Sequence, residues 1–201
     1  MKKTGACTIE MITQTTLPLM SFGEFTITLF TNSIDNAEHF CLTKEPVNFN
    51  APGPLVRIHS ECLTGDLLGS CRCDCGAQMN QALQQIAENG GIFIYLRQEG
   101  RGIGLANKLK AYALQDLGYD TVDANVHLGL PVDNRNYVVA ACILDYIGAS
   151  KIRLLTNNPC KVAAMHEHGI VVSERVPLLT TPEKENQQYL KTKQDKMGHY
   201  L

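Results

Sequence analysis

Apolar and polar residues alternate along the N-terminal part of the chain, most regularly over residues 23–30 (GEFTITLF). A period of two predicts strands with one buried face, so we expect short strands between residues 8 and 43. Residues 48–54 (NFNAPGP) then predict a turn, because they combine asparagine, glycine and proline. Residues 55–61 predict a further strand, whose successive side chains point to opposite faces.

After residue 76 the apolar residues recur three and four positions apart, which predicts a helix over residues 78–89. The elements predicted after it are strand 92–96, helix 105–117, helix 137–147, strand 151–156, helix 159–167, strand 170–172 and a polar, helix-like tail over 186–201. A strand–helix–strand succession implies parallel strands. We therefore predict an α/β fold with a mixed, partly parallel sheet covered by helices and an antiparallel, strand-rich N-terminal part.

No linker, repeat or low-complexity tract divides the 201 residues, so we expect a single domain over residues 1–201. Its strand-rich part is residues 1–54, and the motifs that carry chemistry lie in residues 55–201. Hydrophobic residues make up 44% of the chain and charged residues 19%, which is typical of a globular protein. The formal net charge of −2 argues against non-specific binding to nucleic acid.

Neither a membrane span nor a signal peptide is expected from the sequence. No apolar run reaches the roughly 18 residues that cross a bilayer, and the basic start has no apolar segment behind it. Four of the eight cysteines crowd between Cys62 and Cys75. This crowding favours free thiols in a reducing, cytoplasmic compartment and a metal site over a disulfide framework.

The crowded cysteines have the spacing Cys62-x10-Cys73-x-Cys75, with Cys71 two residues before Cys73. Zinc usually takes four tetrahedral ligands, so three cysteines would leave one position for water, as in a catalytic site. Two alternatives stay open: a closed four-cysteine site that includes Cys71, and buried thiols that act as small apolar residues. Alternation along a strand would place Cys71 on the same face as the other two. His59 and His127 are the histidines considered as a fourth ligand, although a hydrogen-bonding role is expected for each.

Glycines alternate with Arg101 in the segment 97–104 (RQEGRGIG), which follows a predicted strand and precedes a helix. Backbone N–H groups in such a loop bind anions, but a solvated turn is the alternative. Asp133-Asn134-Arg135 and residues 156–161 have a similar ambiguity, since each segment is also suited to capping a helix, with its cation in solvent. The cations near strand ends or loops are Arg57, Arg97, Arg101, Arg135 and Lys161, and together they favour a polyphosphate substrate.

Several long motifs resemble those of the GTP cyclohydrolase II family: 57–66 (RIHSECLTGD), 72–76 (RCDCG), 97–101 (RQEGR), 108–116 (KLKAYALQD) and 154–159 (LLTNNP). Shorter matches follow at 119–121, 174–177 and 196–199. The resemblance covers most of the chain from about residue 55 onward, while the N-terminal quarter resembles the family only loosely.

The resemblance implies the first committed step of riboflavin synthesis, in which GTP and water give 2,5-diamino-6-(5-phosphoribosylamino)pyrimidin-4(3H)-one, formate and pyrophosphate. It implies that Cys62, Cys73 and Cys75 bind zinc, that Mg²⁺ arrives with the triphosphate, and that the protein is a homodimer. Cys71 falls where the family pattern varies. The positions that match GTP contacts are Arg57, Ile58, His59, Ser60, Glu61, Gln78, Glu99, Gly100, Arg101, Thr121, Thr156 and Lys161.

By the same resemblance, Asp133 matches a proposed proton acceptor, Arg135 a proposed nucleophile, and Tyr112 a residue that assists ring opening. A guanidinium has a pKa above about 12, so Arg135 attacks only if Asp133 takes its proton; otherwise it stabilises charge on the phosphate. Glu99 or Glu61 is suited to reading the guanine base. The alternatives are a non-catalytic nucleotide sensor and a truncated cyclohydrolase that stops at the formylamino product. The presence of Tyr112, Asp133 and Arg135 together favours the complete reaction.

Overall fold

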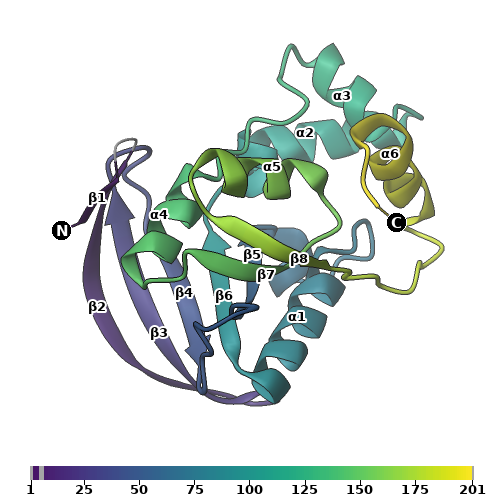
Figure 1. Cartoon of the computed structure of the whole chain (residues 1–201). Helices are drawn as coiled ribbons and strands as arrows, with labels where there is room; N and C mark the ends of the chain where they lie inside the picture. Colours follow the sequence, from purple (N-terminus) through teal and green to yellow (C-terminus); the bar gives the residue numbers. More distant parts are fainter. Residues whose placement is uncertain (1, 5–6, 201) are drawn as a thin grey trace. The chain divides into compact units, whose positions relative to one another are not determined.

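The computed structural model describes residues 2–4 and 7–200, and the strands of these residues form one eight-stranded sheet (Figure 1). The strands are β1 Lys2–Thr4, β2 Cys7–Leu19, β3 Gly23–Asn32, β4 His39–Lys44, β5 Leu55–Ser60, β6 Gly91–Leu96, β7 Lys151–Leu155 and β8 Val171–Val176, in the order β1-β2-β3-β4-β6-β5-β7-β8. Pairing is antiparallel from β1 through β4 to β6, and parallel between β5 and β7 and between β7 and β8. The predicted mixed sheet and its antiparallel N-terminal part are confirmed.

The helices are α1 Cys75–Asn89, α2 Leu105–Asp116, α3 Thr121–His127, α4 Val138–Tyr146, α5 Pro159–Glu167 and α6 Gln187–Met197. Five of them confirm predicted helices, although α1 begins at Cys75 rather than at residue 78. Helix α3 was not predicted, because its seven residues bury only Ala124 and Asn125 and so show no apolar period. Its start is set locally by Asp120, whose carboxylate accepts hydrogen bonds from the backbone N–H groups of Val122 and Asp123. No helix of the described residues is long and apolar enough to cross a membrane.

The described residues group into two compact units that alternate along the chain. We call Met1–His59, Asn80–Arg97 and Tyr137–Leu178 the sheet unit. We call Ser60–Met79, Gln98–Asn136 and Leu179–Leu201 the cysteine unit. Because each unit is assembled from three separate segments, no single cut of the sequence divides them. The expectation of a single domain is not tested by this grouping and stays a prediction.

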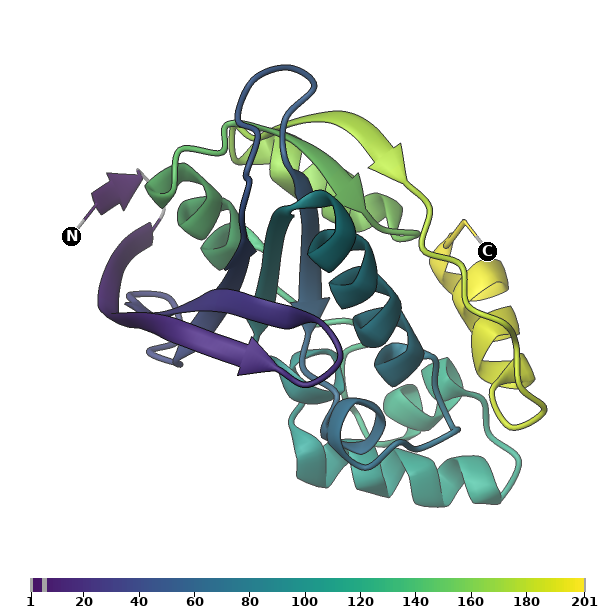
Figure 2. The ribbon, with the colours of Figure 1, turned by 90° about the horizontal axis from the view of Figure 1, so that it is seen from below.

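Both faces of the central strands in the sheet unit are buried. Ile92 and Ile94 of β6 belong to the core that also contains α4, while the buried Phe93 between them faces the other way. Helix α4 is buried from Val138 to Leu144, which explains its nearly continuous apolar sequence. Figure 2 shows α1 on the side of β5 and β6 opposite to α4. The uninterrupted apolar run of β6 is therefore that of a strand covered on both faces, as predicted.

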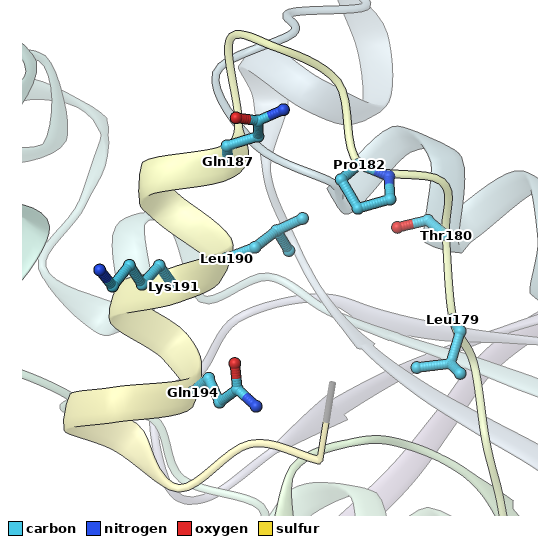
Figure 3. A pocket seen from close by; sticks show the side chains of 7 residues that line it. All are labelled: Leu179, Thr180, Pro182, Gln187, Leu190, Lys191 and Gln194. Carbon is cyan, nitrogen blue, oxygen red and sulfur yellow. The ribbon is translucent and has the colours of Figure 1, made fainter.

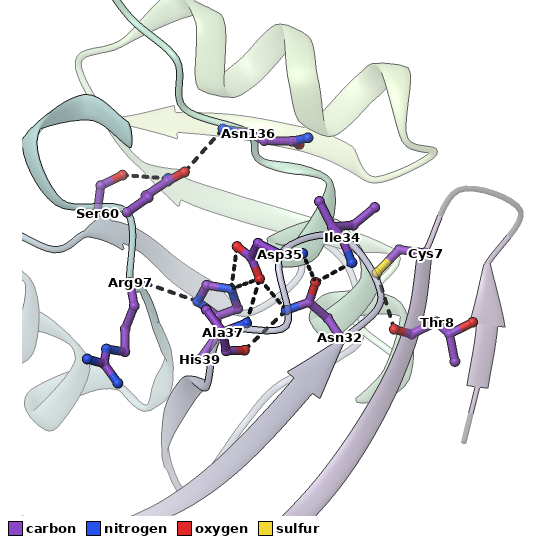
Figure 4. Close-up of polar contacts among 11 residues, drawn as sticks. Cys7, Thr8, Asn32, Ile34, Asp35, Ala37, His39, Ser60, Arg97 and Asn136 are labelled. Carbon is purple, nitrogen blue, oxygen red and sulfur yellow. Dashed lines mark hydrogen bonds and ion pairs between the residues drawn. The ribbon is translucent and has the colours of Figure 1, made fainter. Parts of the chain in front are cut away.

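A buried histidine fixes the end of β6, at the point where the chain leaves the sheet (Figure 4). His39 accepts a hydrogen bond at Nδ1 from the backbone N–H of Arg97 (3.0 Å). Its Nε2 lies 3.2 Å from the Asp35 carboxylate, which also accepts from the side-chain amide of Asn32 (2.8 Å). Since Nδ1 is an acceptor, the ring is neutral and carries its proton on Nε2. The side chain of His39 therefore joins the turn after β3 to the end of β6.

Candidate metal centre and active site

Three cysteine side chains of the cysteine unit converge. The sulfur atoms of Cys62, Cys73 and Cys75 all lie within 4.8 Å of one another, and those of Cys62 and Cys73 are 3.6 Å apart. A tetrahedral zinc ion with bonds of about 2.3 Å places its sulfur ligands about 3.8 Å apart. No other group of three or more potential metal ligands is found among residues 2–4 and 7–200. The sulfur spacing therefore fits a single tetrahedral ion.

The backbone around the cluster is shaped to bring the sulfurs together. Cys62 precedes a short π-helical turn, Leu63–Leu67, and its N–H donates to the Asp66 carboxylate (3.0 Å). Within that turn a Cβ atom on Gly65 would lie 3.0 Å from the sulfur of Cys73 and 3.2 Å from that of Cys62. A side chain at this position would require the thiols to move by a few tenths of an ångström.

The predicted strand alignment of Cys71 with Cys73 and Cys75 is wrong. Residues 71–74 form turns and bends, and Cys75 is already the first residue of α1. Cys71 is exposed and lies outside the three-sulfur group, so the closed four-cysteine alternative is wrong as well. Neither His59 nor His127 belongs to the group. The period-two interpretation failed because the chain turns between the second and third ligands instead of running straight.

Lys108 of α2 is the cation nearest to the described thiols. Its Nζ donates to the sulfur of Cys62 (3.1 Å) and to Oε1 of Glu99 (2.8 Å). Hydrogen bonds from Cys73 and Cys75, followed by the charge of Lys108, hold the pKa of the Cys62 thiol far below its usual range. The Cys62 thiolate in turn raises the pKa of Cys73 to about 11. Without a metal the cluster is thus one thiolate with two thiols, and a dication is needed to ionise all three. This donor set fits zinc.

Tyr112 lies one helical turn beyond Lys108, beside the cluster. Its hydroxyl is 3.5 Å from Oγ1 of Thr64, which is itself 3.7 Å from the sulfur of Cys62. Burial raises the pKa of the Tyr112 phenol, so the group keeps its proton at neutral pH. The ring is also covered by cations, with Arg72 at 5.0 Å and Lys108 at 5.7 Å from its centroid. The protonated phenol of Tyr112 therefore lies beside the thiols.

Asp133 and Arg135 form a two-point ion pair. Nε of Arg135 donates to both carboxylate oxygens of Asp133 (2.9 and 3.1 Å), and Nη2 donates to one of them. Burial alone would raise the pKa of Asp133, but the hydrogen bonds and charge of Arg135 hold it below its usual value. The alternative of a helix cap with a solvated arginine is wrong, because the Asp133 carboxylate binds the N–H and guanidinium of Arg135.

The glycine-rich segment lies against this ion pair. The backbone N–H of Asn134 donates to the carbonyl of Arg101 (2.9 Å), and a Cβ atom on Gly102 would lie 2.8 Å from the carbonyl oxygen of Asn134. Gly100 and Arg101 both have positive φ, 63° and 61°, which is unusual for arginine. Residues 98–104 of the predicted segment 97–104 and the predicted segment Asp133–Arg135 are therefore neighbours in the cysteine unit.

Residues 10–177 match the model of the family described as GTP cyclohydrolase II. The chain belongs to this enzyme family. The resemblance stated above is thereby confirmed, and the match also includes strands β3 and β4 of the N-terminal part.

Curated relatives agree with the family assignment. The riboflavin biosynthesis protein RibBA of Bacillus velezensis is 54% identical over 187 residues, which are 92% of this chain and 47% of that protein. RibBA of Bacillus subtilis is 52% identical over 194 residues (96% and 48%), and that of Chlamydia muridarum 50% over 195 residues (96% and 46%). The chain spans about half the length of these relatives. A two-domain 3,4-dihydroxy-2-butanone 4-phosphate synthase from A. baumannii aligns over 74% of this chain and 34% of its own, at 21% identity and a TM-score of 0.41, a likeness too weak for structural argument.

Among the positions that match GTP contacts of the cyclohydrolase II family, three in the sheet unit, Arg57, Thr156 and Lys161, bind its backbone. Arg57 donates from Nη1 to the carbonyl of Leu155 (3.0 Å), and Lys161 donates from Nζ to that of Ile58 (2.7 Å). Lys161 is 5% exposed, so the alternative of a solvated lysine is wrong. Asn158 caps α5 as expected, and its own N–H donates to Oγ1 of Thr156 (3.0 Å).

Two further family positions of the sheet unit have buried side chains. Ile58 is fully buried, so it offers a ligand only its backbone. His59 is 2% exposed and stacks on Phe93 and Tyr95, with centroids 5.6 and 5.5 Å away. These contacts are ring stacking, and the hydrogen-bonding role that we expected for the histidine stays a prediction.

The family positions of the cysteine unit vary more in their contacts. Oγ of Ser60 accepts from Gln98 (2.9 Å), and Gln78 donates to the carboxylate of Asp74 (2.6 Å). The hydroxyl of Thr121 is buried without a hydrogen-bond partner among the described residues. Since the matched positions are divided between the two units, their convergence on one substrate stays a prediction.

Sequence reasoning missed two lysines that contact this site. Lys108 was detectable, since it precedes Tyr112 by four residues and so lies on the same face of the predicted helix. Lys193 of α6, which donates to Asp74, gave no such signal, because 119 positions separate the two.

Proposed function

We propose that this chain is a zinc-dependent GTP cyclohydrolase II, which converts GTP and water into 2,5-diamino-6-(5-phosphoribosylamino)pyrimidin-4(3H)-one, formate and pyrophosphate. The observation that carries the proposal is the three-sulfur cluster with Tyr112 beside it, in a chain of this family. Cys62, Cys73 and Cys75 would hold the zinc, and Mg²⁺ would enter with the triphosphate. The reaction is the first step of riboflavin synthesis from GTP.

The ring chemistry is assigned to the neighbourhood of the cysteines. Zinc, when bound there, supplies a Lewis acid that activates water at neutral pH. Hydrolysis at C8 breaks a carbon–nitrogen bond of the imidazole ring, and the departing nitrogen requires a proton. We assign this proton to Tyr112, because its raised pKa keeps the phenol protonated. Its hydroxyl lies 3.5 Å from that of Thr64, in the π-helical turn that follows Cys62. A second hydrolysis at the same carbon releases formate.

Pyrophosphate release is assigned to the Asp133–Arg135 pair and the adjoining Arg101. Because the pKa of Asp133 is lowered, its carboxylate stays ionised and Arg135 stays a cation. This favours Arg135 as a stabiliser of charge that develops on the α-phosphate. The covalent alternative requires Asp133 to accept a proton from Arg135 during attack. Mass spectrometry under single-turnover conditions separates the two, since only the covalent route yields a phosphoramidate adduct on Arg135.

Base recognition is assigned to Glu61 rather than Glu99. The Glu99 carboxylate already accepts hydrogen bonds from Lys108 (2.8 Å) and from the backbone N–H groups of Leu63 and Gly100 (both 2.6 Å). Those contacts make Glu99 a support for the loops around the cysteines. Glu61 is half-exposed and adjoins Cys62, so its carboxylate is suited to accept from N1–H and the 2-amino group of guanine.

The test is incubation with GTP and Mg²⁺, with formate, pyrophosphate and the diaminopyrimidine quantified. Cys73→Ser is expected to lose zinc and formate release, whereas Cys71→Ser, in the same loop but exposed, is expected to keep both. Zinc-loaded protein that binds GTP without releasing formate would contradict the proposal and favour the nucleotide-sensor alternative. Protein that stops at the formylamino product would favour the truncated cyclohydrolase.

We also propose that the protein is a cytoplasmic homodimer. All eight cysteines are free thiols, which agrees with a reducing compartment. The homodimer follows from the family resemblance, and sedimentation analysis at several protein concentrations tests it.

A further inference from the structure

Helix α6 reaches the loop that holds the cysteines. It begins at Gln187, beyond residue 177 where the family match ends. Nζ of Lys193 donates to Oδ1 of Asp74 (2.5 Å), and Asp74 stands between Cys73 and Cys75. The side chains of this pair are 11% and 1% exposed. A helix outside the matched segment thus provides the ionic partner of a residue flanked by two of the three thiols.

The carboxylate of Asp74 also binds Gln78, a position that matches a GTP contact of the family. Its second oxygen accepts from the side-chain amide of Gln78 (2.6 Å), and its backbone carbonyl accepts from the N–H of the same residue (2.9 Å). A buried carboxylate beside thiolates is unfavourable unless a cation accompanies it. Lys193 is that cation, so it helps to fix both the Cys73–Cys75 loop and Gln78.

The same face of α6 also touches the phosphate segment. Tyr189 precedes Lys193 by one helical turn, and its ring centroid lies 4.5 Å from the Lys193 ammonium. The guanidinium carbon of Arg101 lies 5.8 Å from the same centroid. Tyr189 therefore contacts both the cation that pairs with Asp74 and the cation assigned to the triphosphate.

Apolar packing does not account for how α6 is held. Of its residues whose burial the structure describes, the buried ones are Thr192 and Lys193, both polar. Leu190 instead borders a hollow of about 510 Å³ between α6 and the segment that leads into it, as Figure 3 shows. The hollow is lined by Leu179, Thr180, Pro182, Gln187, Leu190, Lys191 and Gln194. Within the cysteine unit, the buried contacts that these residues of α6 make are therefore polar.

We propose that α6 is a positioning element of the active site. Through Asp74, Lys193 holds the Cys73–Cys75 loop and Gln78 in place, and Tyr189 holds Arg101. The kinetic part of this inference rests on the proposed function, whereas its effect on metal binding does not.

The test compares two lysines of the same helix. Lys193→Met removes the partner of Asp74, while Lys196→Met removes a cation that pairs with Asp120 and Asp123 at the start of α3, away from the cysteines. We expect Lys193→Met to bind zinc roughly 10–100-fold more weakly in competition with a chromogenic chelator, as is typical when a residue supporting a metal ligand is lost. Its kcat should fall as well, and Lys193→Arg should recover most of both losses. Lys196→Met should stay within about twofold of the wild type in zinc affinity.

Zinc affinity and kcat of Lys193→Met within twofold of the wild type would overturn the inference. The inference would also be overturned if Lys193→Met and Lys196→Met lost zinc affinity and kcat equally and in proportion to the fall in their melting temperatures. Helix α6 would then act on stability alone. If Lys193→Met does not fold, a second variant, Tyr189→Leu, is tested instead, because it keeps the ion pair between Lys193 and Asp74. It should raise KM for GTP and leave zinc affinity unchanged, and an unaltered KM overturns the role assigned to Tyr189. If the wild type releases no formate, the proposed function fails, while the chelator competition still decides the role of Lys193.

Discussion

The ammonium of Lys108 bridges Cys62 and Glu99, at 3.1 Å from the sulfur and 2.8 Å from Oε1. Three thiolates around a zinc dication carry one net negative charge, which this buried lysine offsets. We therefore expect Lys108→Met to bind zinc roughly 10–100-fold more weakly than the wild type. Chelator competition measures the affinity.

Lys110 offers the matched control for that experiment. It lies on the same helix but is exposed, so Lys110→Met should bind zinc as the wild type does. Equal zinc affinity of both variants would show that the contact with Cys62 does not contribute to the metal site.

A second prediction concerns the phenol of Tyr112. Tyr112→Phe retains the ring beneath the cations of Arg72 and Lys108 but loses the proton donor. Formate release should slow by about 10²–10⁴-fold, the usual contribution of a general acid. Pyrophosphate release should slow far less, so that GMP with an intact imidazole ring accumulates and is detected by quenched-flow chromatography. Tyr119→Phe, at an exposed tyrosine, is the control; parallel slowing of both products by Tyr112→Phe would remove Tyr112 from ring opening.

The sequence predicted the elements with a strong hydrophobic period and failed where no such period marks the local structure. The helix over 159–167 was predicted to the residue, because proline begins it and Asn158 caps it. Helix α3 was missed, because its seven residues show no apolar period and only the carboxylate cap marks its start. The misplacement of Cys71 has another cause: extending a strand through a turn assigns the wrong face to every second side chain.

The candidate site shows the same division. Cysteine spacing indicated a metal site but left the part of Cys71 open, and only the folded arrangement of the thiols removes Cys71 from the group. The pairing of Asp74 with Lys193 joins residues 119 positions apart, and no local pattern carries such a contact. The division into two interleaved units is likewise a property of long-range contacts rather than of composition.

The third prediction concerns Arg135 and separates pyrophosphate release from the hydrolysis of the guanine ring. Arg135→Lys keeps a positive charge but loses the two-point geometry with Asp133. Pyrophosphate release should fall by about 10²–10³-fold, as when one preorganised donor to a transition state is removed. Because neither residue belongs to the sulfur cluster, zinc content by atomic absorption should not change. Loss of zinc along with pyrophosphate release would instead point to a general disturbance of the cysteine unit.

The last prediction concerns stability and pH at His39. Burial lowers the pKa of this imidazole and the guanidinium of Arg97 adds to that effect, although the Asp35 carboxylate opposes both. Between the lowered folded value and the unfolded value of about 6.5, the unfolded chain binds more protons, so stability rises with pH. The contribution of His39 is therefore complete above about pH 6.5 and is lost as the pH falls towards the folded pKa. The pKa of Asp35 is lowered too, so its own contribution is lost only in acid below about pH 4.

Urea unfolding of the wild type and His39→Gln at pH 7.5 and pH 5.5 tests this. At pH 7.5 the variant should be less stable by about 1–3 kcal/mol, because the N–H of Arg97 loses its acceptor at Nδ1. At pH 5.5 the difference should shrink, because the unfolded wild-type chain gains a proton on this histidine that the unfolded variant cannot gain. The other histidines are common to both proteins, so their titration cancels in the comparison. A difference that stays constant between the two pH values would mean that His39 does not titrate in this window and that its contribution is packing alone.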